Sequence, residues 1–282
     1  MEYMTLNNGV KMPLLGFGTF QIDPIKTEEC VLNAIASGYR LIDTAQGYFN
    51  EEGVGNAIKK CGVSRSDLFI VTKIWISNAG YENAKLSIED SLKKLQTNYI
   101  DLCLIHHVFN DYYGTYRAME DVYKEGKIRA IGVSNFSPDR FIDLANCVDI
   151  IPAINQVEFH AFFQQKELRP VLERYGTKMM GWAPLSQGKK CLFSNDTLLS
   201  IADKYKKTIP QIVLRFIVQN GIATIPKTIH IERLNENISI FDFNLSDDEI
   251  KKIETLDVGH SMFIDFCNPK VAEMFTSNQK RR

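Results

Sequence analysis

The sequence has little that would direct it to a membrane, to export or to nucleic acid. Its 33 Lys and Arg residues are balanced by 34 Asp and Glu residues, which leaves a formal net charge of −1. A chain without a basic surplus does not favour a polyanionic backbone as its main ligand. No apolar run approaches the roughly 18 residues of a spanning helix, and residues 1–9 lack the basic and apolar regions of a secretory signal. We therefore predict a cytoplasmic protein without nucleic-acid or membrane partners.

Clustered cysteines are also missing. The chain has no Cys-x-x-Cys pair, and its six cysteines are scattered from position 30 to position 267. In a chain of 282 residues this pattern predicts free thiols in a reducing compartment, with neither a disulfide framework nor a metal site.

Several common catalytic and nucleotide-binding motifs are absent as well. The sequence contains no Walker A loop, no Gly-x-Ser-x-Gly elbow and no His-Glu-x-x-His zinc motif. Gly16 and Gly18 begin a dinucleotide-type Gly-x-Gly pattern, but Gln21 stands where its third glycine belongs. A Rossmann fold is therefore disfavoured.

What the chain does contain is a regular alternation of apolar runs and helical periods. Hydrophobic residues make up 45% of the sequence, enough for a folded core. Asn8-Gly9 predicts a β-hairpin within 4–13. Strand-like runs then occupy 14–18, 40–43, 68–73, 100–106, 128–134, 152–158, 178–184 and 221–227. Between them lie amphipathic stretches such as Ala84, Ile88, Leu92 and Leu95.

This alternation predicts an α/β protein, a (β/α)8 TIM barrel formed by one domain over residues 1–282. The hairpin would cap the barrel. One helix is expected around 197–218, and a capping box at Ser246–Glu249 opens another. Residues 258–282 have no clear period, and we expect them to fold as a loop over the active-site mouth.

Polar residues end most of the predicted strands, where the loops of a barrel form its active site. Asp43, Lys73, His106 and the nearby Tyr48 together supply a carboxylate, an ammonium, an imidazole and a phenol. A lysine near a phenol lowers its pKa, and a carboxylate keeps the lysine charged. Each residue also has a structural interpretation: Asp43 as a helix cap and Tyr48 as a packing residue. His106 and His107, if both lie on a strand, point to opposite faces.

These residues fall within motifs that resemble one known family. The segment LIDTAQGYFNEEGVGNAI (41–58) is similar to the Asp-Thr-Ala-x-x-Tyr-x-Asn-Glu signature of the aldo-keto reductases. Blocks similar to those of the family follow in order at 71–75, 101–107, 131–137, 154–160 and 225–237. The short loops resemble the bacterial 2,5-diketo-D-gluconate reductase-like and glyoxal reductase-like branch.

The resemblance implies a catalytic tetrad and an NADPH site. Tyr48 would be the general acid, Lys73 held by Asp43 would lower its pKa, and His106 would orient the carbonyl. The implied cofactor residues fall into four groups. The carboxamide would be bound by Ser134, Asn135 and Gln156, and Trp182 would stack on the nicotinamide ring. The 2′-phosphate would be held by Lys227, Thr228 and Arg233, and the adenine by Glu236 and Asn237. Asp196 and the loop near 185–190 are expected to cover the pyrophosphate.

The expected substrate pocket departs from the family pattern. Phe20, Trp75 and His107 are expected to line it, and His107 stands where the family often has Trp or Gln. The segment 107–113 ends in two tyrosines that are candidates for substrate contact, and Phe266-Cys267 replaces a more usual His-Arg pair.

We therefore expect NADPH-dependent reduction of small aldehydes, dicarbonyls or keto-sugars by a monomer that needs no metal. Two alternatives stay open. One is a non-enzymatic NADPH-binding sensor or scaffold on the same fold. The other is an isomerase or aldolase that uses Lys73 as a Schiff base.

Overall fold

Parallel strands form a barrel in the computed structural model, which describes residues 1–277. The sheet has 8 strands in sequential order, and all of its pairs are parallel. A parallel bridge between Leu15 and Thr224 joins the last strand to the first and closes the barrel. The expected strands are thus confirmed: β3 (Phe17–Gly18), β4 (Leu41–Asp43), β5 (Phe69–Ile74), β6 (Leu102–Ile105), β7 (Ile131–Ser134), β8 (Ile154–Glu158), β9 (Lys178–Trp182) and β10 (Ala223–Thr224).

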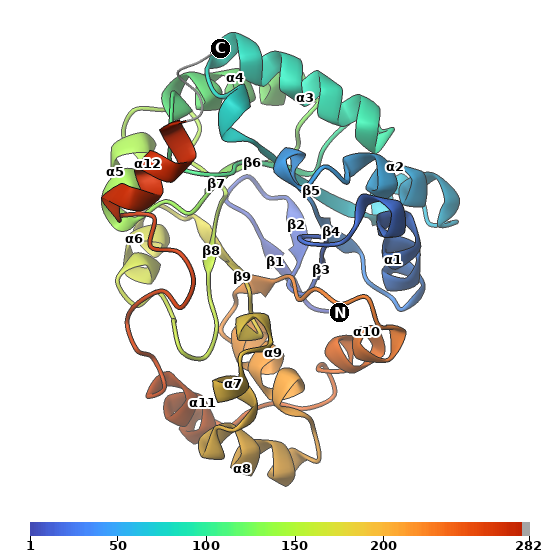
Figure 1. The fold of residues 1–282 in the computed structure, drawn as a ribbon, viewed down its shortest axis with the longest axis vertical. Helices are drawn as coiled ribbons and strands as arrows, with labels where there is room; N and C mark the ends of the chain where they lie inside the picture. The colour runs from blue at the N-terminus through green and yellow to red at the C-terminus, as the bar shows by residue number, and fades with distance from the viewer. Residues whose placement is uncertain (278–282) are drawn as a thin grey trace.

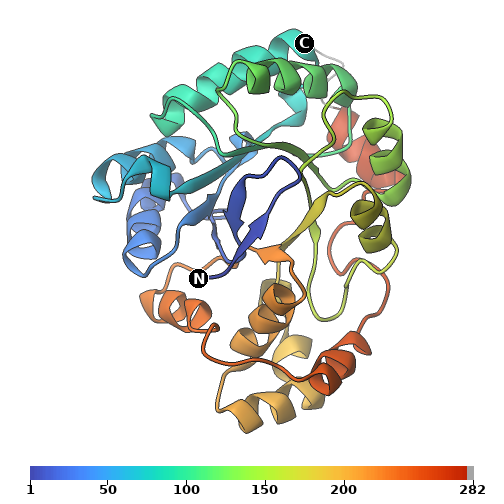
Figure 2. The same ribbon diagram turned by 180° about the vertical axis from the view of Figure 1, so that it is seen from behind.

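Helices surround the barrel (Figures 1 and 2). They are α1 (Pro24–Ala36), α2 (Glu51–Lys60), α3 (Tyr81–Leu95), α4 (Tyr112–Lys124), α5 (Pro138–Ala145), α6 (Leu168–Arg174), α7 (Lys190–Phe193), α8 (Asp196–Tyr205), α9 (Ile209–Gln219), α10 (Ile231–Ile238), α11 (Asp247–Glu254) and α12 (Pro269–Thr276). In α3 the face predicted from its periodicity is the buried one, and α11 begins with the predicted capping box. Within residues 1–277 no helix is long and apolar enough to cross a membrane.

The single helix expected around 197–218 is wrong, because the chain forms α8 and α9 there. Helix α8 ends where Lys206 adopts a left-handed conformation, with a φ of 53°. Thr208 then starts α9 with a capping box to Gln211, and Pro210 occupies the first turn. The residues that start α9 therefore divide this stretch into two helices, although its apolar periodicity continues across the break.

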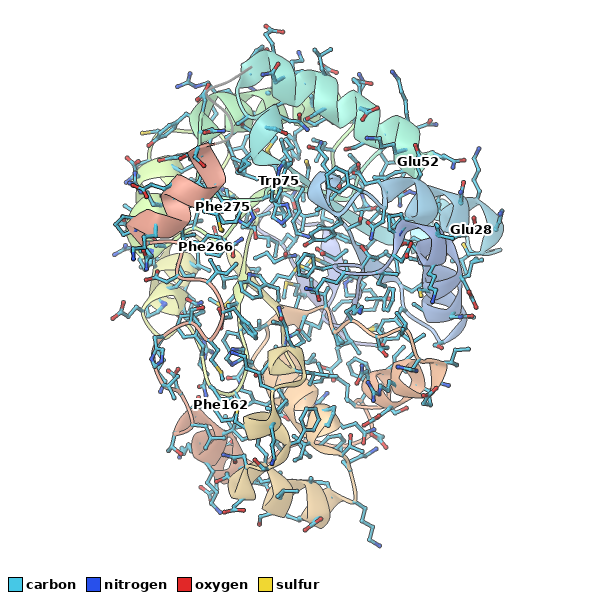
Figure 3. All side chains as sticks on the ribbon, in the orientation of Figure 1. Glu28, Glu52, Trp75, Phe162, Phe266 and Phe275 are labelled. Atoms are coloured by element: carbon cyan, nitrogen blue, oxygen red, sulfur yellow. The ribbon has the colours of Figure 1, made fainter. Side chains whose placement is uncertain are left out.

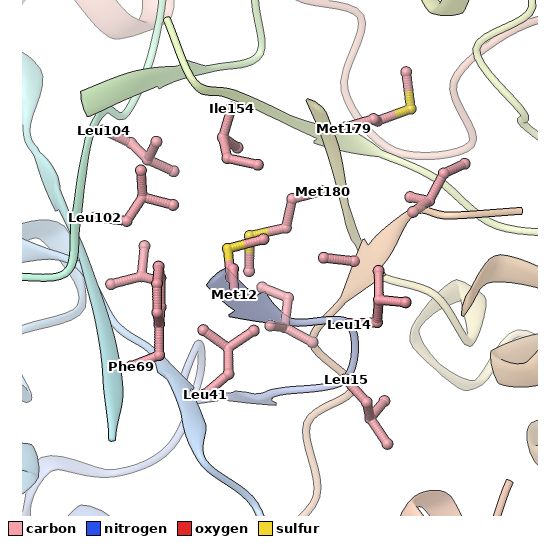
Figure 4. Packing of buried hydrophobic residues seen from close by; sticks show 14 of the residues in the cluster. Met12, Leu14, Leu15, Leu41, Phe69, Leu102, Leu104, Ile154, Met179 and Met180 are labelled. Carbon is pink, nitrogen blue, oxygen red and sulfur yellow. The ribbon is translucent and has the colours of Figure 1, made fainter. Parts of the chain in front are cut away.

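The N-terminal hairpin seals one end of the barrel. Strands β1 (Tyr3–Thr5) and β2 (Lys11–Pro13) pair antiparallel, and they lie across the barrel in Figure 2. Met12 is fully buried and lies in the centre of the apolar cluster that also contains Leu41, Phe69 and Met180 (Figure 4). This packing leaves the opposite end as the mouth of the barrel.

The C-terminal residues up to 277 cover part of that mouth, as expected, and 278–282 lie outside the residues that the structure describes. We call residues 257–277 the mouth segment; its helix α12 lies in front of α5, at the edge of the barrel, in Figure 1. The buried carboxylate of Glu158, at the end of β8, fastens it: Oε2 accepts a hydrogen bond from Ser261 Oγ at 2.5 Å, and Oε1 accepts one from the Met262 backbone at 2.8 Å. Helix α12 was not predicted, although Asn268 and Pro269 form an ordinary helix start.

Candidate active site

The four predicted tetrad residues meet at the mouth. Asp43 ends β4, Lys73 lies near the end of β5, His106 follows β6, and Tyr48 lies in the 3₁₀ turn Gln46–Tyr48. Lys73 Nζ is 2.5 Å from Asp43 Oδ1 and donates to the Tyr48 hydroxyl oxygen at 3.4 Å. The rings of Tyr48 and His106 meet edge to face, with centroids 5.4 Å apart. Asp43 therefore contacts the lysine and does not cap a helix.

Burial controls the charges in this cluster. Lys73 and Asp43 are both buried, and burial opposes ionisation of each group while their mutual attraction supports it. Burial and the Asp43 carboxylate raise the pKa of Tyr48 well above its usual range. Burial and, second, the Asp43 carboxylate therefore outweigh the lowering of this pKa that was expected from Lys73. Tyr48 consequently stays protonated at neutral pH.

The two adjacent histidines share one side of the site, so the expectation of opposite faces is wrong. Strand β6 ends at Ile105, and the backbone turns at the residues that follow. The rings of His106 and His107 stack at 4.4 Å between centroids, with only 16° between their planes. Burial lowers the pKa of His106 well below its usual range and lowers that of His107 to about 3. Both imidazoles are therefore neutral at neutral pH.

A cavity of about 950 Å³ extends from the tetrad across the mouth. It is lined by all the residues expected to hold a cofactor: Ser134, Asn135, Gln156, Trp182, Lys227, Thr228, Arg233, Glu236 and Asn237. Asn135 Oδ1 accepts from the Trp182 indole at 2.9 Å. Gln156 Nε2 donates to Asp43 Oδ2 at 2.7 Å, which connects this wall of the groove to the tetrad.

The far end of the groove suits a phosphate group. Lys227 and Arg233 are exposed there, and neither makes an ion pair with any of residues 1–277. Thr208, which sequence reasoning missed, also lines this end and donates a hydrogen bond to Glu236 Oε1 at 2.5 Å. An elongated groove with free cations at one end and polar and aromatic groups at the other fits an NADP-type dinucleotide.

The loop after β9 forms another wall. Leu185, Gln187 and Gly188 line the cavity, as expected for the 185–190 loop. Ala183, Ser186 and Gln187 have φ angles of 52°, 49° and 51°, a conformation that is strained for non-glycine residues. Asp196 lies instead in the first turn of α8 and is not among the residues that line the cavity.

Aromatic side chains surround the substrate end. Phe20, Trp75 and His107 line the cavity as predicted. Phe275 of α12 was missed by the sequence analysis, and its ring lies 6.2 Å from Trp75 and 6.1 Å from Phe266; the three are labelled in Figure 3.

The two tyrosines proposed to contact substrate do not line the cavity. Tyr112 is buried against Phe136 in the first turn of α4, and the hydroxyl of Tyr113 donates a hydrogen bond to Asp143. The side chain of the same segment that joins the aromatic wall is Phe109, whose ring stacks at 5.3 Å on Phe275.

Comparison with known proteins agrees with this geometry. The model of the aldo/keto reductase family matches residues 14–258. Glyoxal reductase of Bacillus subtilis (strain 168) is 47% identical over 257 residues, which cover 90% of this chain and 92% of the relative. Methylglyoxal reductase of Escherichia coli (strain K12) is 39% identical over 257 residues, covering 90% and 93%.

Solved structures give the same result. An aldo-keto reductase from a Medee basin deep-sea metagenome library superposes with a TM-score of 0.91 at 40% identity, covering 94% of this chain and 98% of the other. A Bombyx mori aldo-keto reductase in complex with NADP superposes with a TM-score of 0.88 at 32% identity, covering 94% and 95%. The chain therefore belongs to the aldo/keto reductase family and is an NADP(H)-dependent oxidoreductase.

Proposed function

We propose that the protein reduces small aldehydes and ketones, dicarbonyls and keto-sugars included, to alcohols, with Tyr48 as the proton donor. One observation carries the proposal. A protonated phenol, a lysine–carboxylate pair and a neutral imidazole lie at one end of a groove, and Lys227 and Arg233 lie at the other. The names of the relatives support dicarbonyl substrates, since two of them are called glyoxal and methylglyoxal reductase.

When bound in the groove, NADPH would supply the hydride that reduction of the carbonyl carbon requires. Tyr48 gives its hydroxyl proton to the carbonyl oxygen, and His106 donates a hydrogen bond to the same oxygen and orients it. The phenolate that remains is stabilised by Lys73, whose Nζ is 3.4 Å from the hydroxyl oxygen. Asp43 keeps that lysine charged and in position through its 2.5 Å contact.

The groove residues would hold the cofactor. Ser134, Asn135 and Gln156 are proposed to bind the carboxamide, and Trp182 to stack on the nicotinamide ring. The 2′-phosphate clamp would comprise Lys227, Thr228 and Arg233, and the adenine contacts Glu236 and Asn237. Arg233 suits this role because a guanidinium can grip phosphate through two hydrogen bonds.

The experiment that tests this proposal follows the loss of reduced-nicotinamide absorbance with NADPH and with NADH. The substrates are methylglyoxal, phenylglyoxal, diketogluconate and simple aldehydes. We expect Tyr48→Phe to lower kcat by about 10²-fold or more, the usual contribution of general acid catalysis. NADPH binding, followed by fluorescence, should be nearly unchanged. Tyr113→Phe is the matched control, since its hydroxyl bonds to Asp143 outside the cavity.

Other outcomes favour the alternatives. Tight NADPH binding without turnover of any substrate would support a sensor or scaffold, and wild-type turnover by Tyr48→Phe would refute the proposed proton donor. Borohydride trapping of substrate on Lys73 would revive the Schiff-base hypothesis. The buried ammonium of Lys73 contacts Asp43 and donates to the carbonyl of Thr44 at 3.0 Å, which opposes its use as a free nucleophile.

We also propose that the protein is a cytoplasmic monomer. The support for the compartment is that all six cysteines are free thiols. Light scattering during size-exclusion chromatography tests the oligomeric state directly.

A further inference from the structure

His107 is held in one orientation by its neighbours. One face stacks on His106, and the rings of Phe275 and Phe266 lie 4.7 Å and 5.0 Å from it. The ring of Trp75 meets it edge-on at 5.3 Å. A ring enclosed in this way has lost its rotational freedom before substrate arrives, so a polar atom on it is already oriented.

The hydrogen bonds of His107 decide which of its nitrogens carries the proton. Asn135 Nδ2 lies 3.2 Å from Nδ1, and it also donates to the His106 carbonyl oxygen at 3.0 Å and to Ser134 Oγ at 3.1 Å. The amide orientation is assigned from its network, since Asn135 Oδ1 accepts from Trp182. Because an amide nitrogen donates and does not accept, this contact favours a hydrogen on Nε2 rather than on Nδ1. Nε2 has no hydrogen-bond partner among residues 1–277. It is not one of the fully buried polar atoms that lack a partner, and His107 lines the cavity. His107 thus presents a neutral N–H donor to the cavity.

We propose that this N–H binds the second, non-reacting carbonyl oxygen of a 1,2-dicarbonyl substrate. The inference rests on the proposed function, in which Tyr48 and His106 bind the oxygen that is reduced. The His107 ring lies parallel to that of His106 at 4.4 Å, so the two rings offer neighbouring positions to neighbouring oxygens. In a 1,2-dicarbonyl the two oxygens sit on adjacent carbon atoms, which is the arrangement that this pair of rings suits.

The walls around the histidines define the rest of the substrate. Trp75, Phe266 and Phe275 supply apolar rings at this end of the cavity. The cationic residues among those that line the cavity are Lys227 and Arg233, at the cofactor end. Among residues 1–277, no lysine or arginine lines the cavity beside the histidines. These apolar rings favour a 2-oxoaldehyde with an apolar or aromatic substituent.

A matched pair of substrates tests the role of His107. Phenylglyoxal and phenylacetaldehyde differ in that a carbonyl group of the first is a methylene in the second. The measurement is the ratio of their kcat/KM values with NADPH. Hydration of each aldehyde cancels when the same solutions are given to every variant. We expect His107→Phe, which keeps a ring but removes the donor, to lower this ratio about tenfold, the effect of one lost hydrogen bond.

Two further variants and one control sharpen the result. His107→Leu also lacks the donor and should lower the ratio similarly, which keeps the test available if the Phe variant fails to fold. His107→Gln retains an N–H donor and should keep the ratio within about threefold of wild type, since most of one hydrogen bond is preserved. Tyr113→Phe, outside the cavity, should leave it unchanged.

An unchanged ratio in a folded, NADPH-binding His107→Phe or His107→Leu protein would overturn the inference and leave His107 as a wall residue. Failure of the proposed function looks different. In that case the wild-type protein oxidises NADPH with neither substrate.

Discussion

The stability of the protein should fall in mild acid because of His107. Burial, with a smaller contribution from the charge of Lys73, lowers the pKa of this imidazole from 6.5 to about 3. The unfolded chain binds a proton near pH 6.5 and the folded chain does not, so stability is lost as the pH falls from about 6.5 towards 3. One pKa unit corresponds to about 1.4 kcal/mol, so about 2 kcal/mol is lost between about pH 8 and about pH 5.

The assay is urea unfolding at these two pH values, followed by circular dichroism and by tryptophan fluorescence. His107→Phe keeps the stack on His106 and removes the titrating group, so the variant should lose about 2 kcal/mol less than the wild type over the same range. His106 titrates in both proteins and cancels in the difference. Equal losses in the two proteins would refute the reasoning, since they would mean that His107 can be protonated inside the folded barrel.

Two further predictions concern the cofactor clamp and the helix packing. Arg233→Ala should weaken NADPH binding about tenfold or more while affecting NADH little, because a charge-assisted contact to phosphate contributes about 1.5–3 kcal/mol; equal losses in titrations with both nucleotides would remove Arg233 from the clamp. Gly55→Ala should destabilise the fold by about 1–3 kcal/mol, measured by urea unfolding, because the added Cβ would lie 2.2 Å from the carbonyl oxygen of Lys94 and force α2 away from α3. Lys59→Ala, on the exposed side of α2, is its control, and a Gly55→Ala protein as stable as this control would contradict the packing argument.

The barrel and the cluster of polar residues at its mouth were predictable because both depend on local patterns. Near-continuous apolar runs give buried parallel strands, and residues such as Asp43 and Lys73 lie where these strands end. The first strand of the barrel is shorter than predicted. The sequence predicted a strand over 14–18, but β3 covers only Phe17–Gly18, because Leu15 contributes only an isolated bridge to Thr224. The ends of a strand depend on its pairing with neighbouring strands, which lie elsewhere in the sequence.

What could not be predicted depends on contacts between distant segments. The stack of His107 on His106 follows from where β6 ends, and no side-chain periodicity marks that residue. Phe275 joins the pocket because Glu158, far away in the sequence, fastens the mouth segment. The raised pKa of Tyr48 likewise depends on burial and, second, on the nearby Asp43 carboxylate, and both follow from the three-dimensional packing.

The hairpin at the closed end of the barrel also determines where protons travel. Met12 packs with Leu41 and Met180 in an apolar layer between that end and Lys73, and such a layer offers a proton no polar groups to follow. If Tyr48 gives up its proton in each turnover, it must recover one through the mouth, after the alcohol has left and water has entered. Regeneration of the acid is then coupled to release of the product through the mouth.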